Sequence, residues 1–214
     1  MKLSTSILSI KSDIEEKVKL IDSLNTDYIH LDIMDGKFVP NKTKDFKEVY
    51  EYVKDLSKPL DVHLMVNDIK KYVDKYALLS PEFITFHIEA TDNPEELINY
   101  IRSKNIKVGM SIKPNTDFED LGPYLRDLDL ILVMSVEPGR GGQEFLLDME
   151  EKIDELRLLK NAYGYNYLIE VDGGINNRTV TRCLNADIVV VGSYITSSND
   201  YEKSINEINK KIGK

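Results

Sequence analysis

The chain alternates between short runs of apolar residues and longer amphipathic stretches that are rich in charge. Most of the apolar runs lie about 20–35 residues apart, which is the length of one strand–helix unit. Several runs are apolar at nearly every position, as is typical of strands buried on both faces of a parallel sheet. The pattern predicts eight strands, at Leu3–Leu8, Tyr28–Ile33, Leu60–Val66, Phe83–His87, Lys107–Ile112, Leu130–Val136, Tyr167–Val171 and Ile188–Val191.

The amphipathic stretches between these runs predict helices. Apolar residues recur at a spacing of three and four across Phe46–Val53, which places them on one helix face. Asn93 and Pro94 are typical of an N-cap and a first helical position. Ser12 and Glu15 have the spacing of a capping box, so we expect a helix to begin there.

Eight strand–helix repeats within 214 residues predict an α/β fold, a (β/α)8 TIM barrel, with a doubly wound open sheet as the alternative. No composition shift, linker or low-complexity tract interrupts the chain, so we expect residues 1–214 to form a single barrel domain. A barrel of this type places its catalytic groups at the carboxyl ends of the strands. The unusual polar residues of this chain fall at those predicted ends.

Charge and cysteine content narrow the possible partners and the compartment. The formal net charge of −9 argues against a nucleic-acid partner, which would require a basic surface. Cys183 is the only cysteine, which excludes an intramolecular disulfide and favours a reducing compartment. The sequence has no signal-peptide pattern and no apolar run near the ~20 residues of a membrane span. We therefore expect a cytoplasmic protein without a membrane partner, and an anionic small substrate remains compatible because backbone amides can bind phosphate.

Histidines and carboxylates converge at the predicted strand ends. His30 and Asp32 are two residues apart on one strand, so their side chains point to the same face. His63 and Asp172 lie at the ends of two other strands and could join them. Two histidines and two carboxylates suit a divalent metal ion such as zinc, iron, manganese or cobalt. Taken singly, a histidine in such a position is more often a hydrogen-bonded structural residue than a metal ligand.

Asp32 and Asp172 are also candidates for acid–base catalysis. They belong to the second and seventh predicted strands, so they would approach a central ligand from different sides. Two such carboxyl groups can remove a proton from one face of a substrate and return one to the other face. The alternative is that each aspartate only caps a loop.

Glycine-rich segments follow the last three predicted strands. Pro138–Gln143 is neither a Walker loop nor a dinucleotide-binding fingerprint, but its glycines could bring backbone N–H groups to an anion or form a lid. Asp172–Gly174 and Gly192–Ser193 follow strands seven and eight, where barrels of this type often bind phosphate. The alternative for all three segments is an ordinary tight turn.

Three methionines, Met34, Met65 and Met134, also fall at predicted strand ends. Methionine in such positions commonly fills a core. The second possibility is that the three side chains form an apolar lining that excludes water from the site.

At these residues the chain resembles the ribulose-phosphate 3-epimerase family. The most specific match is His30–Asn41, which reads H-x-D-x-M-D-G-x-F-V-P-N. The other matches run in family order over nearly the whole chain. They are Ser6–Ser9, Asp61–Val66, Ile84–His87, Val133–Gly139, Gly141–Gln143, Val171–Gly174 and Gly192–Ser193.

The resemblance implies a homo-oligomeric isomerase of the pentose phosphate pathway that interconverts D-ribulose 5-phosphate and D-xylulose 5-phosphate through an enediolate. It implies that one divalent metal ion is held by His30, Asp32, His63 and Asp172, and that Asp32 and Asp172 are the catalytic pair. The substrate-binding residues that it implies are Ser6, His63, Gly139, Arg140, Gly141, Gly142, Asp172, Gly173, Gly174, Gly192 and Ser193.

The chain departs from the family pattern at Thr5, at Lys113 and in the glycine-rich segment, where Glu137 and Arg140 replace the usual Asn and Phe. A cation at Arg140 could contact a different or longer sugar phosphate. The nearest alternative is therefore a related ketose-phosphate 3-epimerase, such as one acting on D-allulose 6-phosphate. A catalytically silent sugar-phosphate-binding barrel is the alternative from another class. The D-x-K-x-x-D motif of the decarboxylase and hexulose-phosphate synthase relatives is absent.

Overall fold

Eight parallel strands close into a barrel in chain order in the computed structural model, which describes residues 1–214. The first strand pairs with both the second and the eighth, so the sheet has no free edge. The predicted TIM barrel is therefore confirmed, and the open doubly wound sheet is wrong. The strands are β1 Lys2–Ser6, β2 Tyr28–Met34, β3 Leu60–Met65, β4 Phe83–His87, β5 Lys107–Ile112, β6 Leu130–Met134, β7 Leu168–Asp172 and β8 Ile188–Val191.

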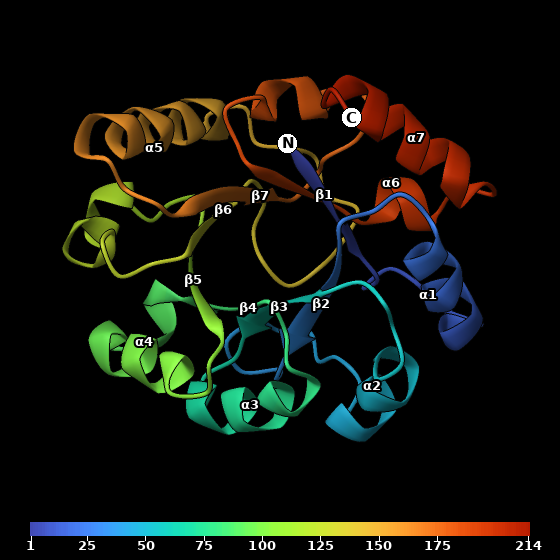
Figure 1. Cartoon of the computed structure of the whole chain (residues 1–214), viewed down its shortest axis with the longest axis horizontal. Coiled ribbons are helices and arrows are strands. Elements are labelled where there is room, and N and C mark those ends of the chain that lie inside the picture. The colour runs from blue at the N-terminus through green and yellow to red at the C-terminus, as the bar shows by residue number, and fades with distance from the viewer.

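Helices surround this barrel in the order of the sequence (Figure 1). None of them is both long enough and apolar enough to span a membrane. The α-helices are α1 Ile14–Ser23, α2 Phe46–Val53, α3 Ile69–Tyr76, α4 Pro94–Arg102, α5 Met149–Tyr163, α6 Ser193–Thr196 and α7 Tyr201–Lys211. Four short 3-10 helices complete the set, η1 Ala77–Leu79, η2 Ile88–Ala90, η3 Phe118–Tyr124 and η4 Thr179–Cys183.

Two connections differ from the regular strand–helix repeat. The segments after β5 and β7 contain the 3-10 helices η3 and η4 where an α-helix would complete the unit. Within η3, Pro123 lacks the backbone N–H that an α-helix interior needs.

The helix starts were predicted with mixed success. The Asn93 side chain accepts a hydrogen bond from the Glu96 backbone N–H, and Pro94 follows at the start of α4, as expected. The capping box at Ser12 is wrong, because Asp13 precedes α1 in the left-handed conformation (φ 54°) and makes no side-chain cap. Glu15 instead pairs with Lys19 along the exposed helix face.

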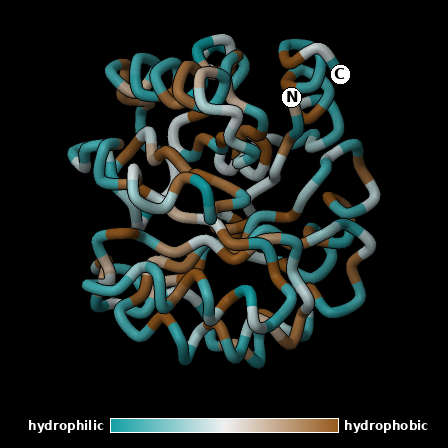
Figure 2. Tube along the Cα trace, turned by 60° about the vertical axis from the view of Figure 1, so that its left-hand side comes forward, coloured by the Kyte–Doolittle hydropathy of each residue, from teal (hydrophilic) through white to brown (hydrophobic).

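Alternate residues of the strands belong to two buried layers. Ile29 and Leu31 of β2 belong to a cluster of 49 residues between the barrel and its helices. Tyr28, Phe83 and Ile188 belong to a separate cluster of seven residues inside the barrel. Figure 2 shows the corresponding apolar stretches through the centre of the molecule and the alternation of polar and apolar residues along the outer helices. Because side chains alternate along a strand, the even-numbered residues of β2 that follow Tyr28 also face the interior.

Candidate active site

Four side chains meet inside the barrel at the carboxyl ends of their strands. His30 and Asp32 come from β2, His63 from β3 and Asp172 from β7, and one ligand atom of each lies within 4.8 Å of the others. The Asp32 Oδ1 atom is central, because it lies 3.5 Å from His30 Nε2 and 3.4 Å from His63 Nδ1. The structure thus brings together the four residues that the sequence predicts for a metal site.

The two imidazoles each turn an unsatisfied nitrogen toward this centre. His30 Nε2 and His63 Nδ1 are buried and have no hydrogen-bond partner. A buried polar atom without a partner is energetically costly, so native proteins rarely retain one without a reason. Two such nitrogens beside two carboxylates form a donor set that fits a divalent cation.

Each imidazole is held from its far side. His30 Nδ1 lies 2.6 Å from Asp61 Oδ2, and the same oxygen accepts a hydrogen bond from the Ser4 hydroxyl at 2.8 Å. His63 Nε2 lies 2.8 Å from His87 Nε2. Hydrogen bonds to the far nitrogen fix the orientation of a histidine that binds a metal.

The two aspartates of the cluster are held in different protonation states. Burial raises the pKa of Asp32, but His30 and then His63 outweigh this effect and hold that pKa far below its usual range. Burial, followed by the negative charge of Asp32, raises the pKa of Asp172 to about 7. A pair of carboxyl groups with separated pKa values is suited to work as one base and one acid.

A third carboxyl group lies beneath this cluster. Glu170 of β7 is fully buried, and neither of its carboxyl oxygens has a hydrogen-bond partner. Burial and the neighbouring charge of Asp61 raise the pKa of Glu170 well above its usual value. Glu170, Asp61 and His30 form a second group of closely spaced possible ligand atoms. Asp61 and Glu170 were not predicted as site residues from the sequence, although they share the strand parity of His63 and Asp172.

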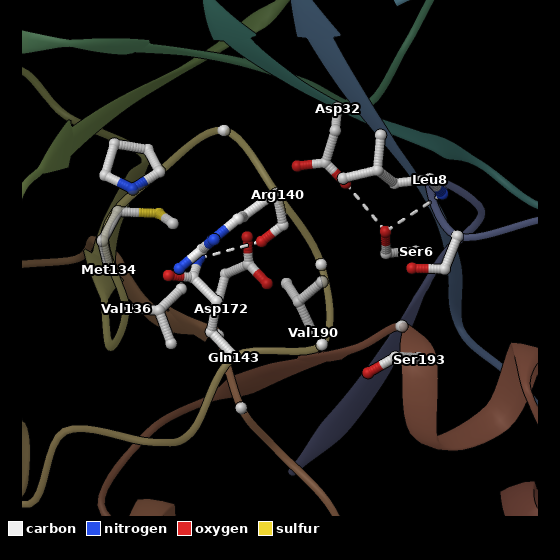
Figure 3. Close-up of a pocket in the computed structure, with 18 of the residues that line it drawn as sticks. Ser6, Leu8, Asp32, Met134, Val136, Arg140, Gln143, Asp172, Val190 and Ser193 are labelled. Carbon is white, nitrogen blue, oxygen red and sulfur yellow. Dashed lines mark hydrogen bonds between the residues drawn. The ribbon is translucent and has the colours of Figure 1, made fainter. Parts of the chain in front are cut away.

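Asp32 and Asp172 of this cluster line a cavity at the carboxyl end of the barrel (Figure 3), whereas His30 and His63 are fully buried and do not line it. Ser6 lies in its wall and donates a hydrogen bond to Asp32 at 2.7 Å. Met34, Met65 and Met134 line the same cavity and are almost fully buried, which confirms the apolar lining.

The glycine-rich segment after β6 covers this cavity. In Figure 1 it crosses the centre of the ring. Asn41 fastens it, because the side-chain amide donates to the Gly139 carbonyl at 2.8 Å. Gly139 has a φ of +112°, and a Cβ there would lie 2.9 Å from Val39. Arg140 is exposed and lines the cavity with Gly141.

The other predicted glycines also line the cavity, together with Ser193 at the start of α6. A Cβ on Gly173 would lie 2.5 Å from Val136, and one on Gly174 would lie 2.3 Å from the Phe145 backbone. Both residues have positive φ angles, so tight packing and backbone conformation require glycine at these positions. A Cβ on Gly192 would lie 3.3 Å from Ser6, a closer contact than most side chains make.

Solved structures of other barrels resemble this fold at low sequence identity. A tryptophan synthase structure from Mycobacterium tuberculosis superposes with a TM-score of 0.73 at 12% identity, covering 99% of this chain and 92% of that chain. A 3-hexulose-6-phosphate synthase from Salmonella typhimurium superposes with a TM-score of 0.63 at 19% identity, covering 99% and 98%. These similarities concern the fold alone.

Sequence similarity is more specific. The ribulose-phosphate 3-epimerase of Helicobacter pylori strain J99 is 39% identical over 209 residues, which cover 96% of this chain and 95% of the relative. The ribulose-phosphate 3-epimerase of Bacillus subtilis strain 168 is 35% identical over 214 residues, which cover 97% and 98%. Residues 2–196 match the profile of the ribulose-phosphate 3 epimerase family. The chain therefore belongs to the ribulose-phosphate 3-epimerase family of isomerases.

Proposed function

We propose that the protein is a metal-dependent epimerase that interconverts D-ribulose 5-phosphate and D-xylulose 5-phosphate. The observation that carries this proposal is the convergence of two unsatisfied imidazole nitrogens with two carboxyl groups in one cluster, whose carboxyl groups line a cavity. Membership of the epimerase family, and the substrate named for relatives across nearly the same length, support the choice of reaction.

His30, Asp32, His63 and Asp172 would hold the metal ion. When bound, the ion supplies positive charge that stabilises the negative charge developing on the substrate as a carbon–hydrogen bond breaks. The donor set is compatible with zinc, iron, manganese or cobalt.

Asp32 and Asp172 would transfer the protons. In the direction where Asp32 acts as the base, its carboxylate removes the proton from C3 and leaves an enediolate. Asp172, which lines the same cavity, would donate a proton to the opposite face of C3. One proton has then moved onto Asp32 and one has left Asp172, so the roles are exchanged for the reverse reaction. Ser6 donates a hydrogen bond that orients the Asp32 carboxylate.

The methionine side chains would exclude water from the reacting groups. A carboxylate is a weak base toward a carbon acid, so the enediolate must be strongly stabilised by its surroundings. Met34, Met65 and Met134 line the cavity without offering a strong hydrogen-bonding group. Exclusion of water strengthens every electrostatic interaction within the site.

The loops after β7 and β8 would bind the phosphate group of the substrate. Gly173, Gly174, Gly192 and Ser193 line one side of the cavity, and Ser193 begins the short helix α6. Backbone N–H groups in such loops can bind an anion without a lysine or arginine. Gly139, Arg140, Gly141 and Gly142 would cover the remainder of the substrate. The proposed contact of His63 with the substrate would lie on the side of the His30, Asp32 and Asp172 cluster.

Substrate entry would require the segment after β6 to move. The cavity measures about 50 Å³, whereas pockets for small ligands commonly measure about 300–1,000 Å³. Gly142 has a positive φ angle, and a Cβ there would contact no other group, so it is free to act as a hinge.

We also propose that residues 1–214 act as one domain within a homo-oligomer. Leu147, Leu158 and Leu184 are exposed on the surface and would be available to a contact between subunits. Light scattering combined with size-exclusion chromatography measures the oligomeric state directly, and a monomer would contradict this proposal.

Proton NMR of D-ribulose 5-phosphate in D2O tests the reaction. With metal-loaded protein we expect loss of the C3 proton signal together with formation of D-xylulose 5-phosphate. Proton exchange without epimer would contradict the two-carboxyl scheme. Turnover of D-allulose 6-phosphate but not of D-ribulose 5-phosphate would assign a different substrate to the protein. Absence of proton exchange with every candidate metal would favour a silent sugar-phosphate-binding barrel.

A further inference from the structure

A chain of hydrogen bonds leads from His63 away from the cavity. His63 Nε2 lies 2.8 Å from His87 Nε2, and His87 Nδ1 lies 3.1 Å from Glu89 Oε2. Both histidine side chains are fully buried. The chain passes from β3 through the end of β4 into η2.

Glu89 is fixed at the outer end of this chain. Its Oε1 atom accepts a hydrogen bond from the Lys113 backbone N–H at 2.7 Å and another from the Thr116 hydroxyl. These two donors belong to the segment after β5. The Glu89 carboxylate therefore connects that segment to His87 at the end of β4 and, through His87, to β3. Phe38 covers the His87 ring, with 4.8 Å between the ring centres.

The positions of the hydrogens follow from what each group can donate. A carboxylate only accepts, so the hydrogen between His87 and Glu89 must be on His87 Nδ1. A neutral His87 then has a bare Nε2, which accepts from His63 Nε2–H. His63 is left with a bare Nδ1, and that atom faces Asp32 at 3.4 Å and Asp172 at 3.9 Å.

We propose that His87 and Glu89 are positioning residues, which fix the tautomer and ring orientation of His63 so that Nδ1 is presented to the metal ion. This inference rests on the proposed metal site. His30 has its own direct partner, Asp61, so the two imidazoles are oriented by separate carboxylates. A substitution at His87 should therefore disturb the orientation of His63 alone. A change that merely loosens the barrel would disturb both imidazoles.

Nitrogen-15 NMR of the metal-free protein tests the tautomer directly. With labelled histidine, we expect His63 to carry its hydrogen on Nε2 and to have a bare Nδ1. In His87→Leu this preference should be lost, whereas His87→Gln should preserve it because the amide oxygen accepts a hydrogen bond. A hydrogen on His63 Nδ1 in the unsubstituted protein would overturn the proposal.

Cobalt(II) binding tests the consequence without any measurement of turnover. Loss of a hydrogen-bonding partner behind a metal ligand typically weakens metal affinity about 10–100-fold. We expect a weakening of that size in His87→Leu, with an altered visible absorption spectrum of bound cobalt, and recovery in His87→Gln. Unchanged affinity and spectrum in His87→Leu would overturn the proposal.

Glu89 offers a second route if His87→Leu fails to fold. The Glu89 side chain is 21% exposed, so Glu89→Ala should fold, and we expect cobalt affinity about tenfold weaker. Glu119→Gln, on the exposed face of η3, is the matched control for loss of a negative charge nearby, and its cobalt affinity should be unchanged. Cobalt affinity equal to that of the unsubstituted protein in Glu89→Ala would overturn the role of Glu89.

Failure of the unsubstituted protein to bind cobalt would instead contradict the metal site itself. The failure of the positioning role and the failure of the metal site can therefore be told apart.

Discussion

Asp32 and Asp172 come from different strands and line one cavity, with one carboxyl oxygen of each within 4.8 Å of the other, and their pKa values are displaced in opposite directions. Two negative charges at this separation in a buried site repel each other strongly. The positive partner of Asp32 is imidazole, whereas Asp172 has 3.9 Å or more to its nearest imidazole nitrogen. The proton therefore resides on Asp172 in the metal-free protein.

Asp172→Asn should reduce turnover strongly, because the amide can neither donate nor accept the catalytic proton. Loss of a general acid or base costs about 10²–10⁴-fold in rate, and we expect kcat to fall by that amount. Proton NMR with D-ribulose 5-phosphate measures the rate, and cobalt content measured alongside separates lost chemistry from lost metal. Activity near that of the unsubstituted protein would contradict the two-carboxyl scheme.

The same substitution should stabilise the metal-free fold at high pH. The folded-state pKa of Asp172 is raised from 3.8 to about 7, so its carboxyl group destabilises the fold increasingly as pH rises through that window. Asp172→Asn should then increase the free energy of unfolding by about 1–3 kcal/mol at pH 8 and leave it unchanged below pH 4. Urea titrations at both pH values measure this, with exposed Asp92→Asn as the control. Equal effects at the two pH values would mean that Asp172 is not protonated in the fold.

Metal affinity should depend on pH for the same reason. Below pH 7 a bound cation must displace the proton of Asp172, whose pKa is about 7 in the metal-free protein. Burial lowers the pKa of His30, but Asp61 and Asp32 outweigh it and raise that pKa well above its usual value, so His30 also releases a proton. We expect cobalt affinity to rise at least about tenfold per pH unit up to pH 7. Chelator competition between pH 5.5 and 8 measures how cobalt affinity changes with pH, and an affinity that does not change with pH would contradict this prediction.

The barrel could be predicted from the sequence because strands buried on both faces leave uninterrupted apolar runs. The structure matches Phe83–His87, Lys107–Ile112 and Ile188–Val191 at both ends. The start of α1 could not be predicted in detail, because the left-handed conformation of Asp13 excludes the capping box at Ser12. A short local motif specifies a helix start only when the preceding backbone permits it.

The residues facing the cavity could also be predicted, because strand parity places them on one face. Their partners depend on the register between strands, which pairs His30 with Asp61 and Asp32 with His63. A single sequence does not contain this register. Glu89 is harder still to identify, because it lies beyond β4 in η2 and contacts His87 through a local turn.

Glu170→Gln should leave the fold intact. Burial and the charge of Asp61 raise the pKa of Glu170 well above its usual value, which favours the neutral side chain. A glutamine of similar shape places no negative charge beside Asp61, and we expect a change in the free energy of unfolding within about 1 kcal/mol. Asp61→Asn is the contrasting variant, because it removes the charged acceptor of both His30 and Ser4 and should destabilise the protein by more than that. Denaturant titrations at pH 7 compare the two, and equal losses would show that Glu170 is ionised.

Asn41→Ala should loosen the segment that covers the cavity. The Asn41 amide donates its hydrogen bond to the Gly139 carbonyl and so connects the segment after β2 to the segment after β6. Loss of one hydrogen bond of about 1 kcal/mol shifts an open–closed equilibrium about fivefold. We expect faster amide hydrogen exchange across residues 138–143 and a KM about fivefold higher, with little change in kcat. Exposed Asn115→Ala is the matched control and should leave both measurements unchanged. Because hydrogen exchange reports the loop directly, an unchanged exchange rate in Asn41→Ala would show that Asn41 does not restrain the loop, whatever the kinetics.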